Sequence, residues 1–491
     1  MTDLTEHREV QLRRDAIGLG GALAGTLANM APVEGIFIVV VLVAAAMGTF
    51  TPWAFLLGAL GILLTGWNVA QLARRVPTAG SYVAFAYHGA GSIARGLSRP
   101  AAAFTFYLSI MSGPVTIAAV VVFLGSWVQT ALGLPNFWWP VFALLAVALT
   151  LPVVLRGAAA SVRTSLLLFL LEAVGLALVS AVILVRSHAS LGAPLHARGG
   201  QPGGWAGLIG ITFATSVSGF IGWENAAAMA DEIKQPRRVV PIAILSSIVV
   251  VALLYVLATW AAVSGYADWL GPLQGMARLG DLTNAAPYVE LADHYAPWLT
   301  WLVYLIGFLS PAACYLAAIT SCSRWTFASA RAGLLPRPLA KVSPRSQVPA
   351  AAVWLWTAAV TALIVVPYFL ADGNAVTVSA YEAGIGTVPL LLVYLLTSLY
   401  TPFYVRKHDR GEFSVVKHVL PAVLAVALVG YGVYEFVLPT QPPPANRFWI
   451  YIGLIFVAAI AFAAVAVRRG GRRLDVLAAT APDEDPAPAA A

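Results

Sequence analysis

Four glutamates stand within long apolar stretches of the chain: Glu34, Glu172, Glu224 and Glu382. An ionised side chain at the centre of a bilayer costs about 3 kcal/mol when it faces lipid. Such acids therefore face the interior of a helix bundle, where they hold a counter-charge or carry a proton. The alternative for each is a purely structural hydrogen bond, which is the interpretation favoured for Glu382.

Two of the apolar stretches are interrupted by glycine, proline and hydroxyl residues. The first reads LANMAPVEGIF over Leu27–Phe37, and the second reads FATSVSGFIGWEN over Phe213–Asn225. An unwound membrane helix offers free backbone N–H and C=O groups and points its half-helix dipoles at a ligand. Paired breaks thus predict a binding site near the bilayer midplane, although glycine and proline can also merely kink packed helices.

The candidate binding residues lie in these two breaks and at one later aromatic position. They are Asn29, Met30, Ala31, Glu34, Gly35, Thr215, Ser216, Ser218, Gly219, Phe220, Trp223 and Tyr381. Backbone groups of 29–35 and 215–222 would bind the polar head of a ligand, and the three aromatic residues would line or gate the site. Glu34, Glu172 and Glu224 are the candidate proton carriers.

The elements that must position these residues are membrane-spanning helices. Of the 491 residues, 60% are hydrophobic and only 10% are charged, too few charges to cover a soluble protein of this length. A span needs about 20 apolar residues. Twelve stretches qualify as spans: 16–47, 51–73, 100–131, 137–155, 164–186, 205–230, 239–264, 297–323, 349–370, 375–403, 418–438 and 448–467. The sequence therefore predicts an all-α polytopic membrane protein.

The basic residues predict the orientation of these spans. With a cytoplasmic N-terminus, all but four of the 29 lysine and arginine residues fall on the cytoplasmic side. The four exceptions are Arg186, Arg198, Arg278 and Arg447. This asymmetry follows the positive-inside rule, so the excess of positive charge faces lipid and is no sign of nucleic-acid binding. It predicts a multi-pass protein of the cell (inner or plasma) membrane with both termini in the cytoplasm.

The chain divides into a short N-terminal segment (1–15), a core (16–403), two further helices (418–467) and a tail (468–491) that we expect to be disordered. No nucleotide loop, metal triad, nucleophile motif or soluble catalytic domain is apparent, so an enzyme is not expected. Cys314 and Cys322 have neither disulfide nor zinc spacing. The sequence does not indicate an oligomeric state.

Three segments resemble the amino acid–polyamine–organocation permeases. These are QLARRVPTAGSYV (Gln71–Val83), GFIGWENAAAMADEIKQPRRVVPIAI (Gly219–Ile244) and SRWTFASARAGLLPRPLAKVSPRSQVP (Ser323–Pro349). They occur in the family's order and at its spacing, so the resemblance covers nearly the whole chain. It implies the LeuT-type fold, with two inverted repeats of five helices (about 16–186 and 205–403) and two appended helices. It also implies a secondary transporter of amino acids or related amines, working by alternating access.

The resemblance assigns coupling roles as well. Glu224 matches a family glutamate linked to proton coupling and gating, and Glu172 stands roughly where some proton-coupled relatives carry lysine. Ala317, Thr320 and Ser321 resemble the sodium-site pattern of sodium-coupled LeuT-type carriers. We expect no cofactor beyond a coupling proton or sodium ion, with proton coupling or exchange favoured over sodium symport.

Departures from the family pattern bear on the ligand. Where much of the family has a glycine-rich break whose amides hold a carboxylate, this chain has Asn29–Pro32, and Gln71 replaces a usual glutamate. The alternatives to a proton-coupled carrier are a sodium-coupled amino acid symporter and a non-transporting membrane receptor built on a permease fold.

Overall fold

A computed structural model describes residues 12, 14–199, 211–281, 286–370, 374–438, 445–470 and 473–475. Over these ranges the chain is helical and forms no strand, apart from an isolated parallel bridge between Ile17 and Ile233. Residues 1–11, the first six residues of the predicted span 205–230 and the tail from 476 lie outside the described part. The prediction of an all-α fold is confirmed.

The helices mostly begin near proline, threonine or serine, and several have proline in the first turn, where its missing N–H costs nothing. Their bounds are α1 (Leu19–Asn29), α2 (Pro32–Met47), α3 (Thr51–Arg75), α4 (Ser81–Ile93), α5 (Ser98–Ala131), α6 (Trp139–Leu155), α7 (Ala158–Arg186), α9 (Ile211–Ser218), α10 (Asn225–Ala228), α11 (Pro236–Leu270), α12 (Pro272–Leu279), α13 (Pro287–Tyr295), α14 (Thr300–Arg331), α15 (Ala350–Leu370), α16 (Ala375–His408), α17 (Leu420–Phe436) and α18 (Phe448–Gly470).

In the described part, 10 helical stretches are long and apolar enough to cross a membrane. The first, Leu19–Arg75, covers two predicted spans because a short 3-10 turn joins α2 to α3. The predicted span 205–230 has no counterpart among them, since its described part is divided into the short helices α9 and α10. A polytopic helical protein is thus established, and the count of twelve spans stays a prediction.

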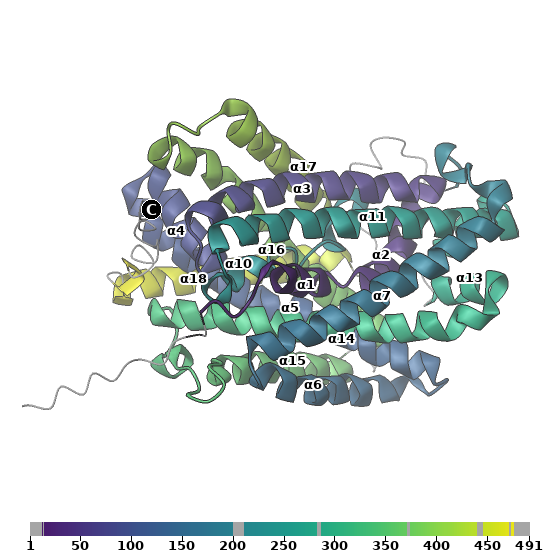
Figure 1. The fold of residues 1–491 in the computed structure, drawn as a ribbon, viewed down its shortest axis with the longest axis horizontal. Coiled ribbons are helices and arrows are strands. Elements are labelled where there is room, and N and C mark those ends of the chain that lie inside the picture. Colours follow the sequence, from purple (N-terminus) through teal and green to yellow (C-terminus); the bar gives the residue numbers. More distant parts are fainter. Residues whose placement is uncertain are drawn as a thin grey trace, which may run out of the picture.

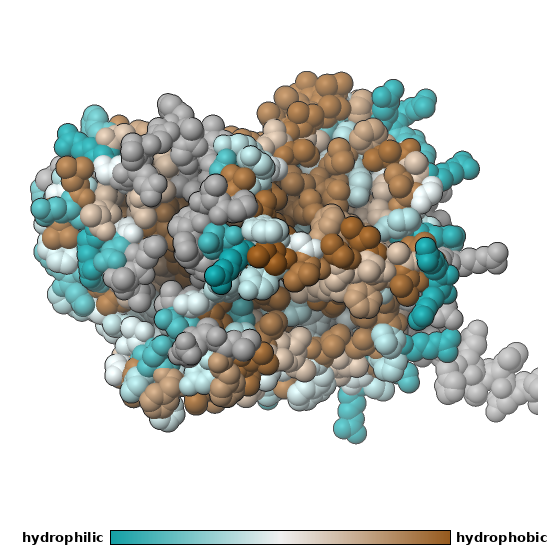
Figure 2. Space-filling view, turned by 180° about the vertical axis from the view of Figure 1, so that it is seen from behind, coloured by the Kyte–Doolittle hydropathy of each residue, from teal (hydrophilic) through white to brown (hydrophobic). Residues whose placement is uncertain are grey.

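The long helices run side by side along the longest axis of the molecule, with α3 and α11 on one side and α6 and α15 on another (Figure 1). Hydrophobic side chains dominate the middle of the face drawn in Figure 2, while hydrophilic ones gather toward its two ends. Many leucine, valine and phenylalanine residues on the outer faces are exposed, as a surface in contact with lipid tails requires. The polar candidates lie among buried residues between the helices.

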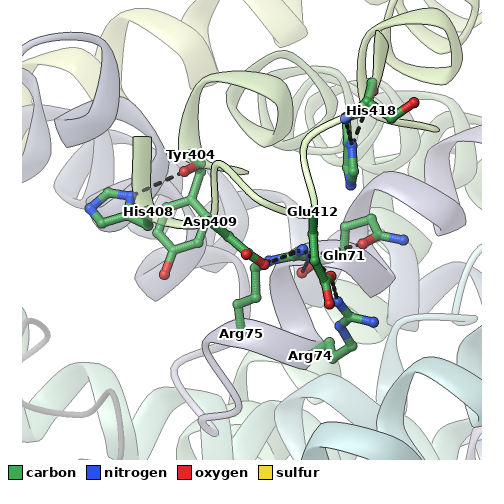
Figure 3. A network of polar contacts seen from close by, with 9 residues as sticks. Gln71, Arg74, Arg75, Tyr404, His408, Asp409, Glu412 and His418 are labelled. Carbon is green, nitrogen blue, oxygen red and sulfur yellow. Dashed lines mark hydrogen bonds and ion pairs between the residues drawn. The ribbon is translucent and has the colours of Figure 1, made fainter. Parts of the chain in front are cut away.

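Basic residues gather where α3, α4, α5 and α16 meet, which we call the basic end of the bundle. Arg75 donates to Asp409 at 2.8 Å and to Glu412 at 3.0 Å, and Lys407 donates to the Gly91 carbonyl at 3.0 Å. Gln71, the departure from the family pattern, accepts a hydrogen bond from Arg75 at 2.8 Å. The Arg75 contacts join the end of α3 to the loop that follows α16 (Figure 3), and the Lys407 contact joins α16 to α4.

A second contact at the basic end fixes the C-terminal part of the described chain. Asp475 accepts two hydrogen bonds from Arg99, at 3.0 and 2.6 Å, and a third from the Tyr87 hydroxyl at 2.8 Å. Partial burial and the bond to Asp475 raise the pKa of Tyr87 to about 12. The Tyr87 hydroxyl belongs to α4, which packs against α5 and α16, so this contact ties the C-terminal residues to that group of helices.

Candidate functional site

The first predicted break lies between α1 and α2. Helix α1 ends at Asn29 and α2 begins at Pro32, which has no backbone N–H and so starts a helix without losing a bond. Between them Ala31 has a left-handed backbone, with φ at 44°. A non-glycine residue in this region is strained and is held there by its surroundings. The break predicted from 29–35 is confirmed.

The second predicted break lies between α9 and α10. Helix α9 ends at Ser218, a series of turns follows, and α10 begins at Asn225. Gly222 has φ at 107°, and a Cβ atom there would lie 2.4 Å from the Asn29 carbonyl oxygen. Only glycine fits both the backbone conformation and the close approach of the first break. This glycine lets the two breaks touch.

Direct contacts join the two breaks. The Asn29 side-chain amide donates to the Gly222 carbonyl at 3.1 Å. Gly35 leaves room for the Tyr255 hydroxyl of α11, which donates to the Gly219 carbonyl. Carbonyls freed by the break in the second helix are thus bonded by residues of α1 and α11, as buried backbone groups require. The structure brings together the two segments that the sequence marked separately.

Helix α14 satisfies the groups left free by the first break. The Ser310 hydroxyl accepts a hydrogen bond from the Glu34 amide at 3.3 Å, and the Cys314 thiol donates to the Asn29 carbonyl at 3.1 Å. The sequence analysis missed Ser310, Cys314 and Tyr255 as parts of the site. Ser310 and Cys314 lie one helical turn apart, but spacing within one span does not reveal which other helix it faces.

Glu34 and Glu172 form what we call the acid pair. Glu172 is completely buried and Glu34 is 8% exposed. The Ser310 hydroxyl and Glu34 both lie close enough to Glu172 to interact with it electrostatically. Among the described residues, neither oxygen of Glu172 and not Oε2 of Glu34 has a hydrogen-bond partner. Both acids are therefore buried near Ser310, beside the first break.

Glu224 lies in a different environment. Its carboxylate accepts a hydrogen bond from the Gly222 amide at 3.1 Å, so it caps the turn within its own break. The neighbouring Trp223 packs on Tyr394 of α16, with ring centroids 4.9 Å apart, and Tyr82 of α4 packs on Tyr394 at 5.5 Å. Glu224 is thus held between its own backbone and a group of aromatic side chains.

The remaining candidates divide between the breaks and other places. Met30 and Phe220 are buried, and Phe220 packs edge-on against Tyr255 at 4.8 Å. Ser218 donates to the Thr215 carbonyl at 2.6 Å, and Ser216 faces Gly58 of α3 rather than the first break. The structure does not bring Tyr381 to this group.

Tyr381 instead packs on α18. Its ring lies 5.6 Å from that of Phe448 and 6.2 Å from that of Tyr451. The sequence could not reveal this direction, because a single aromatic residue in a long apolar helix carries no signal of the face that it occupies. Tyr381 therefore belongs to the packing of α16 against α18 and not to the candidate site.

The predicted sodium-site residues lie on α14 further toward the basic end. Thr320 donates to the Leu316 carbonyl at 2.7 Å and its oxygen lies 2.5 Å from the Ser161 hydroxyl of α7. Ser321 donates to the Ala318 carbonyl at 3.1 Å, and Ala317 is buried. The residue of α7 that contacts Thr320 is thus Ser161 and not Glu172. Glu172 lies about three turns further along α7, beside Ser310.

An ion pair and a short backbone bridge join the segments around the candidate site at the basic end. Arg324 of α14 donates to Glu232 at 2.7 Å, and both side chains are almost fully buried. Ile17 donates to the Glu232 carbonyl at 3.0 Å and accepts from Lys234 at 2.8 Å. The segment before α1, the turn after α10 and α14 are thereby bound to one another.

Asp231 joins the turn after α10 to the loop between α3 and α4. Its carboxylate accepts a hydrogen bond from the Ala79 amide at 2.9 Å. Burial raises the pKa of Asp231 above the ordinary value of 3.8, and the Ala79 bond and nearby Arg331 offset part of that rise. The segments Gln71–Val83, Gly219–Ile244 and Ser323–Pro349, which carry the resemblance to a permease family, therefore meet in space.

A match to a known protein family covers both breaks and the contacts around them. The amino acid permease family matches residues 21–460, which include both breaks, the acid pair and the ion pair at the basic end. The chain belongs to the amino acid permease family. Proteins of this family are membrane transporters and not enzymes.

Individual relatives of this permease are distant and differ in what their names say they carry. A branched-chain amino acid permease of Lactococcus lactis is 25% identical over 323 residues, 64% of each chain. A cationic amino acid transporter of Arabidopsis thaliana is 30% identical over 136 residues, 28% of this chain and 21% of that protein. A methylthioribose transporter of Bacillus subtilis is 24% identical over 340 residues, 65% of this chain and 68% of that protein. The first two matches span less than two thirds of those proteins.

Proposed function

We propose that this permease is a secondary transporter that moves amino acids or related amines across the cytoplasmic membrane by alternating access. The observation that carries the proposal is the contact between two interrupted helices beside a buried acid pair. Interrupted helices that meet in mid-bundle supply free backbone groups and dipoles for a polar ligand. The names of two relatives, a branched-chain and a cationic amino acid transporter, support amino acids as one substrate class.

The packing of the helices supports two inverted repeats. The most extensive pairings join α3 with α11, α5 with α16 and α14 with α7. If the halves correspond as 16–186 and 205–403, the first pairing joins the second helix of each half. The other two pairings then correspond to each other, because each joins the third helix of one half to the fifth helix of the other half. Rocking of one part of such a bundle against the rest is how alternating access works.

We further propose that the basic end faces the cytoplasm and is closed in this conformation. The positive-inside rule supports this orientation, because most lysine and arginine residues lie on that side of the predicted topology. The Arg324–Glu232 pair and the contacts of Ile17 support closure, since they cross from α14 to the segments on either side of the two breaks. Opening toward the cytoplasm would have to separate these contacts.

Proton coupling is the proposed energy source, with Glu34 and Glu172 as the first candidates to carry the proton and Glu224 as the second. A buried carboxyl group without a cation is stable when it is protonated, and it can lose that proton when a conformational change exposes it. The Gly222 amide already stabilises Glu224, which makes it the weaker candidate.

Uptake into proteoliposomes that hold the purified protein tests these proposals. A labelled panel of amino acids and amines is offered first under a pH gradient and then under a sodium gradient. We expect uptake driven by the pH gradient, lost in Glu172→Gln and reduced less in Glu224→Gln. Uptake that requires sodium and is lost in Thr320→Val would instead indicate sodium coupling through the Thr320 hydroxyl. Binding without flux of any compound would identify a receptor and overturn the transport proposal.

A further inference from the structure

The acid pair lacks the counter-ion that buried carboxylates usually have. None of the ion pairs formed by the described residues includes Glu34 or Glu172. Glu172 is completely buried, and neither of its oxygens makes a full hydrogen bond within the same part of the chain, although the Ser310 hydroxyl lies beside it. A buried carboxylate is stable only when it is paired, coordinated or protonated. No described residue supplies a cation here, so Glu34 and Glu172 are either protonated or paired with a cation from outside the described part of the chain.

The first break offers almost nothing to a carboxylate. A helix N-terminus binds anions through the free N–H groups of its first turn. In α2, Pro32 has no N–H, the Glu34 amide donates to Ser310 and the Gly35 amide donates to the Ala31 carbonyl at 2.9 Å. Only Val33 is left to offer an amide in this turn. Glu34 itself adds a carboxyl group to the first turn, where it would repel a second anion when ionised.

In the second break, the Glu224 carboxylate already occupies one of the backbone amides. The Gly222 amide, which lies in the turn between α9 and α10, donates to Glu224. The amides of Phe220 and Ile221 donate to the carbonyls of Val217 and Ser218, at 3.0 and 3.2 Å. At these three residues, as in the first turn of α2, the amides therefore bond to groups of the protein and are not free for a ligand carboxylate.

The aromatic side chains near the acid pair suit an organic ammonium group. Tyr255 lies close enough to Glu34 and Glu172 to interact with both. Its ring packs edge-on against Phe220 at 4.8 Å and against Phe55 at 5.3 Å. Carboxyl groups next to aromatic rings attract a positively charged nitrogen that carries carbon chains, because charge and ring both favour the cation.

We propose that the preferred substrate is an organic amine that has no carboxylate, such as the decarboxylated form of a basic amino acid. This inference rests on the proposed transport function and narrows its substrate class. The positively charged nitrogen lies against Glu34 and Glu172, and the rest of the molecule has no anionic group to place near the breaks. An α-amino acid would bring a carboxylate into a site that has two carboxyl groups and few free amides.

Matched pairs of compounds test the proposal, because each pair differs only in the carboxylate. We use arginine with agmatine and lysine with cadaverine, and measure uptake of each into proteoliposomes and into liposomes without protein. The expected result is that agmatine and cadaverine enter at least tenfold faster than arginine and lysine at equal concentration. Equal or faster entry of the amino acids would overturn the inference and leave the transport function intact.

Binding replaces flux as the readout if none of the four compounds crosses the membrane. Thermal stabilisation of the purified protein by agmatine at concentrations at which arginine has no effect would support the inference, even though the transport function had failed. Stabilisation by arginine alone, or by neither compound, would overturn it. A failure of the transport function can thus be told apart from a failure of the preference for amines.

Two variants test whether the acid pair is the cause of the preference. Glu34→Gln and Glu172→Gln should each lower agmatine uptake at least tenfold and narrow the difference between agmatine and arginine. Glu382→Gln is the matched control, because Glu382 is also a buried carboxyl group without a hydrogen-bond partner in the described chain, but lies on α16. An equal loss in the control would overturn the assignment. If a glutamine variant does not fold, the selectivity of the unaltered protein still decides the proposal.

Discussion

Glu232 and Glu172 are both buried carboxyl groups in one protein, yet only Glu232 has a cation beside it. Arg324 lies 2.7 Å from Glu232, and the two side chains are exposed by 0% and 2%. Glu172 is equally buried, and the polar groups near it among the described residues include the Ser310 hydroxyl, the Tyr255 phenol and a second acid, Glu34. Among the described residues, a counter-ion lies beside the acid that joins segments at the basic end, and none lies beside the acid where the two breaks meet. We infer that the first place is structural and the second is completed by substrate or protons.

The largest expected effect comes from breaking the structural pair. Arg324→Met leaves Glu232 buried without its partner, which typically lowers the free energy of unfolding by about 3–5 kcal/mol. Denaturant titration of the purified protein in detergent measures this loss. The control is Arg74→Met, since Arg74 is 45% exposed in its pair with Glu412 and its loss should cost no more than about 1 kcal/mol.

The double variant Glu232→Leu/Arg324→Met sharpens this test. Replacing both members of a buried pair by apolar side chains is often close to neutral, so most of the lost stability should return. A loss in the double variant as large as in Arg324→Met would mean that the cost comes from packing and not from an unpaired charge. The comparison between the two acidic places would then lose its electrostatic basis.

The second effect is a difference in how much stability each acid contributes at the two places. Glu232→Gln should lower the free energy of unfolding by several kcal/mol, because it leaves Arg324 unpaired. Glu172→Gln should change it by less than about 1 kcal/mol, or raise it, since no cation loses a partner there. Thermal unfolding of both variants at neutral pH provides the measurement. Similar losses in the two variants would contradict the distinction.

The two breaks and the buried glutamates were accessible from the sequence, because each has a local signal. Pro32 cannot continue a helix and Gly222 permits a backbone that other residues avoid, so the breaks could be predicted within a few residues. The glutamates could be marked as buried because the apolar stretches around them are long enough to span. These inferences needed only neighbours along the chain.

What the sequence did not reveal depends on contacts between distant helices. Arg324 and Glu232 are 92 positions apart, and each alone resembles an ordinary charge at the end of a span. Ser310, Cys314 and Tyr255 reach the breaks only through the packing of α14 and α11. The direction of Tyr381 toward α18 depends on the rotation of α16 in the bundle. No local pattern records which face of a uniformly apolar helix meets which neighbour.

The smallest expected effect is on the pH dependence of stability, through Asp231 at the basic end. Burial raises the folded-state pKa of Asp231 above 3.8, so the folded protein holds this proton more tightly than the unfolded chain does. The contribution of Asp231 to stability is therefore greatest below the ordinary value and decreases as pH rises through the folded pKa. In Asp231→Asn this dependence should disappear. We measure the melting temperature of both proteins at pH 4 and at pH 7. Relative to its value at pH 4, the melting temperature at pH 7 should be higher in the variant than in the unaltered protein. The same pH dependence in both proteins would contradict the raised pKa of Asp231.

Equilibrium binding of labelled agmatine tests the central claim most directly, because it asks whether the acid pair takes its cation from outside. Binding is measured with the purified protein, with the double variant Glu34→Gln/Glu172→Gln and with Glu382→Gln. The account predicts saturable binding to the unaltered protein and to Glu382→Gln, and affinity at least tenfold weaker in the double variant. Unchanged binding in the double variant would contradict it.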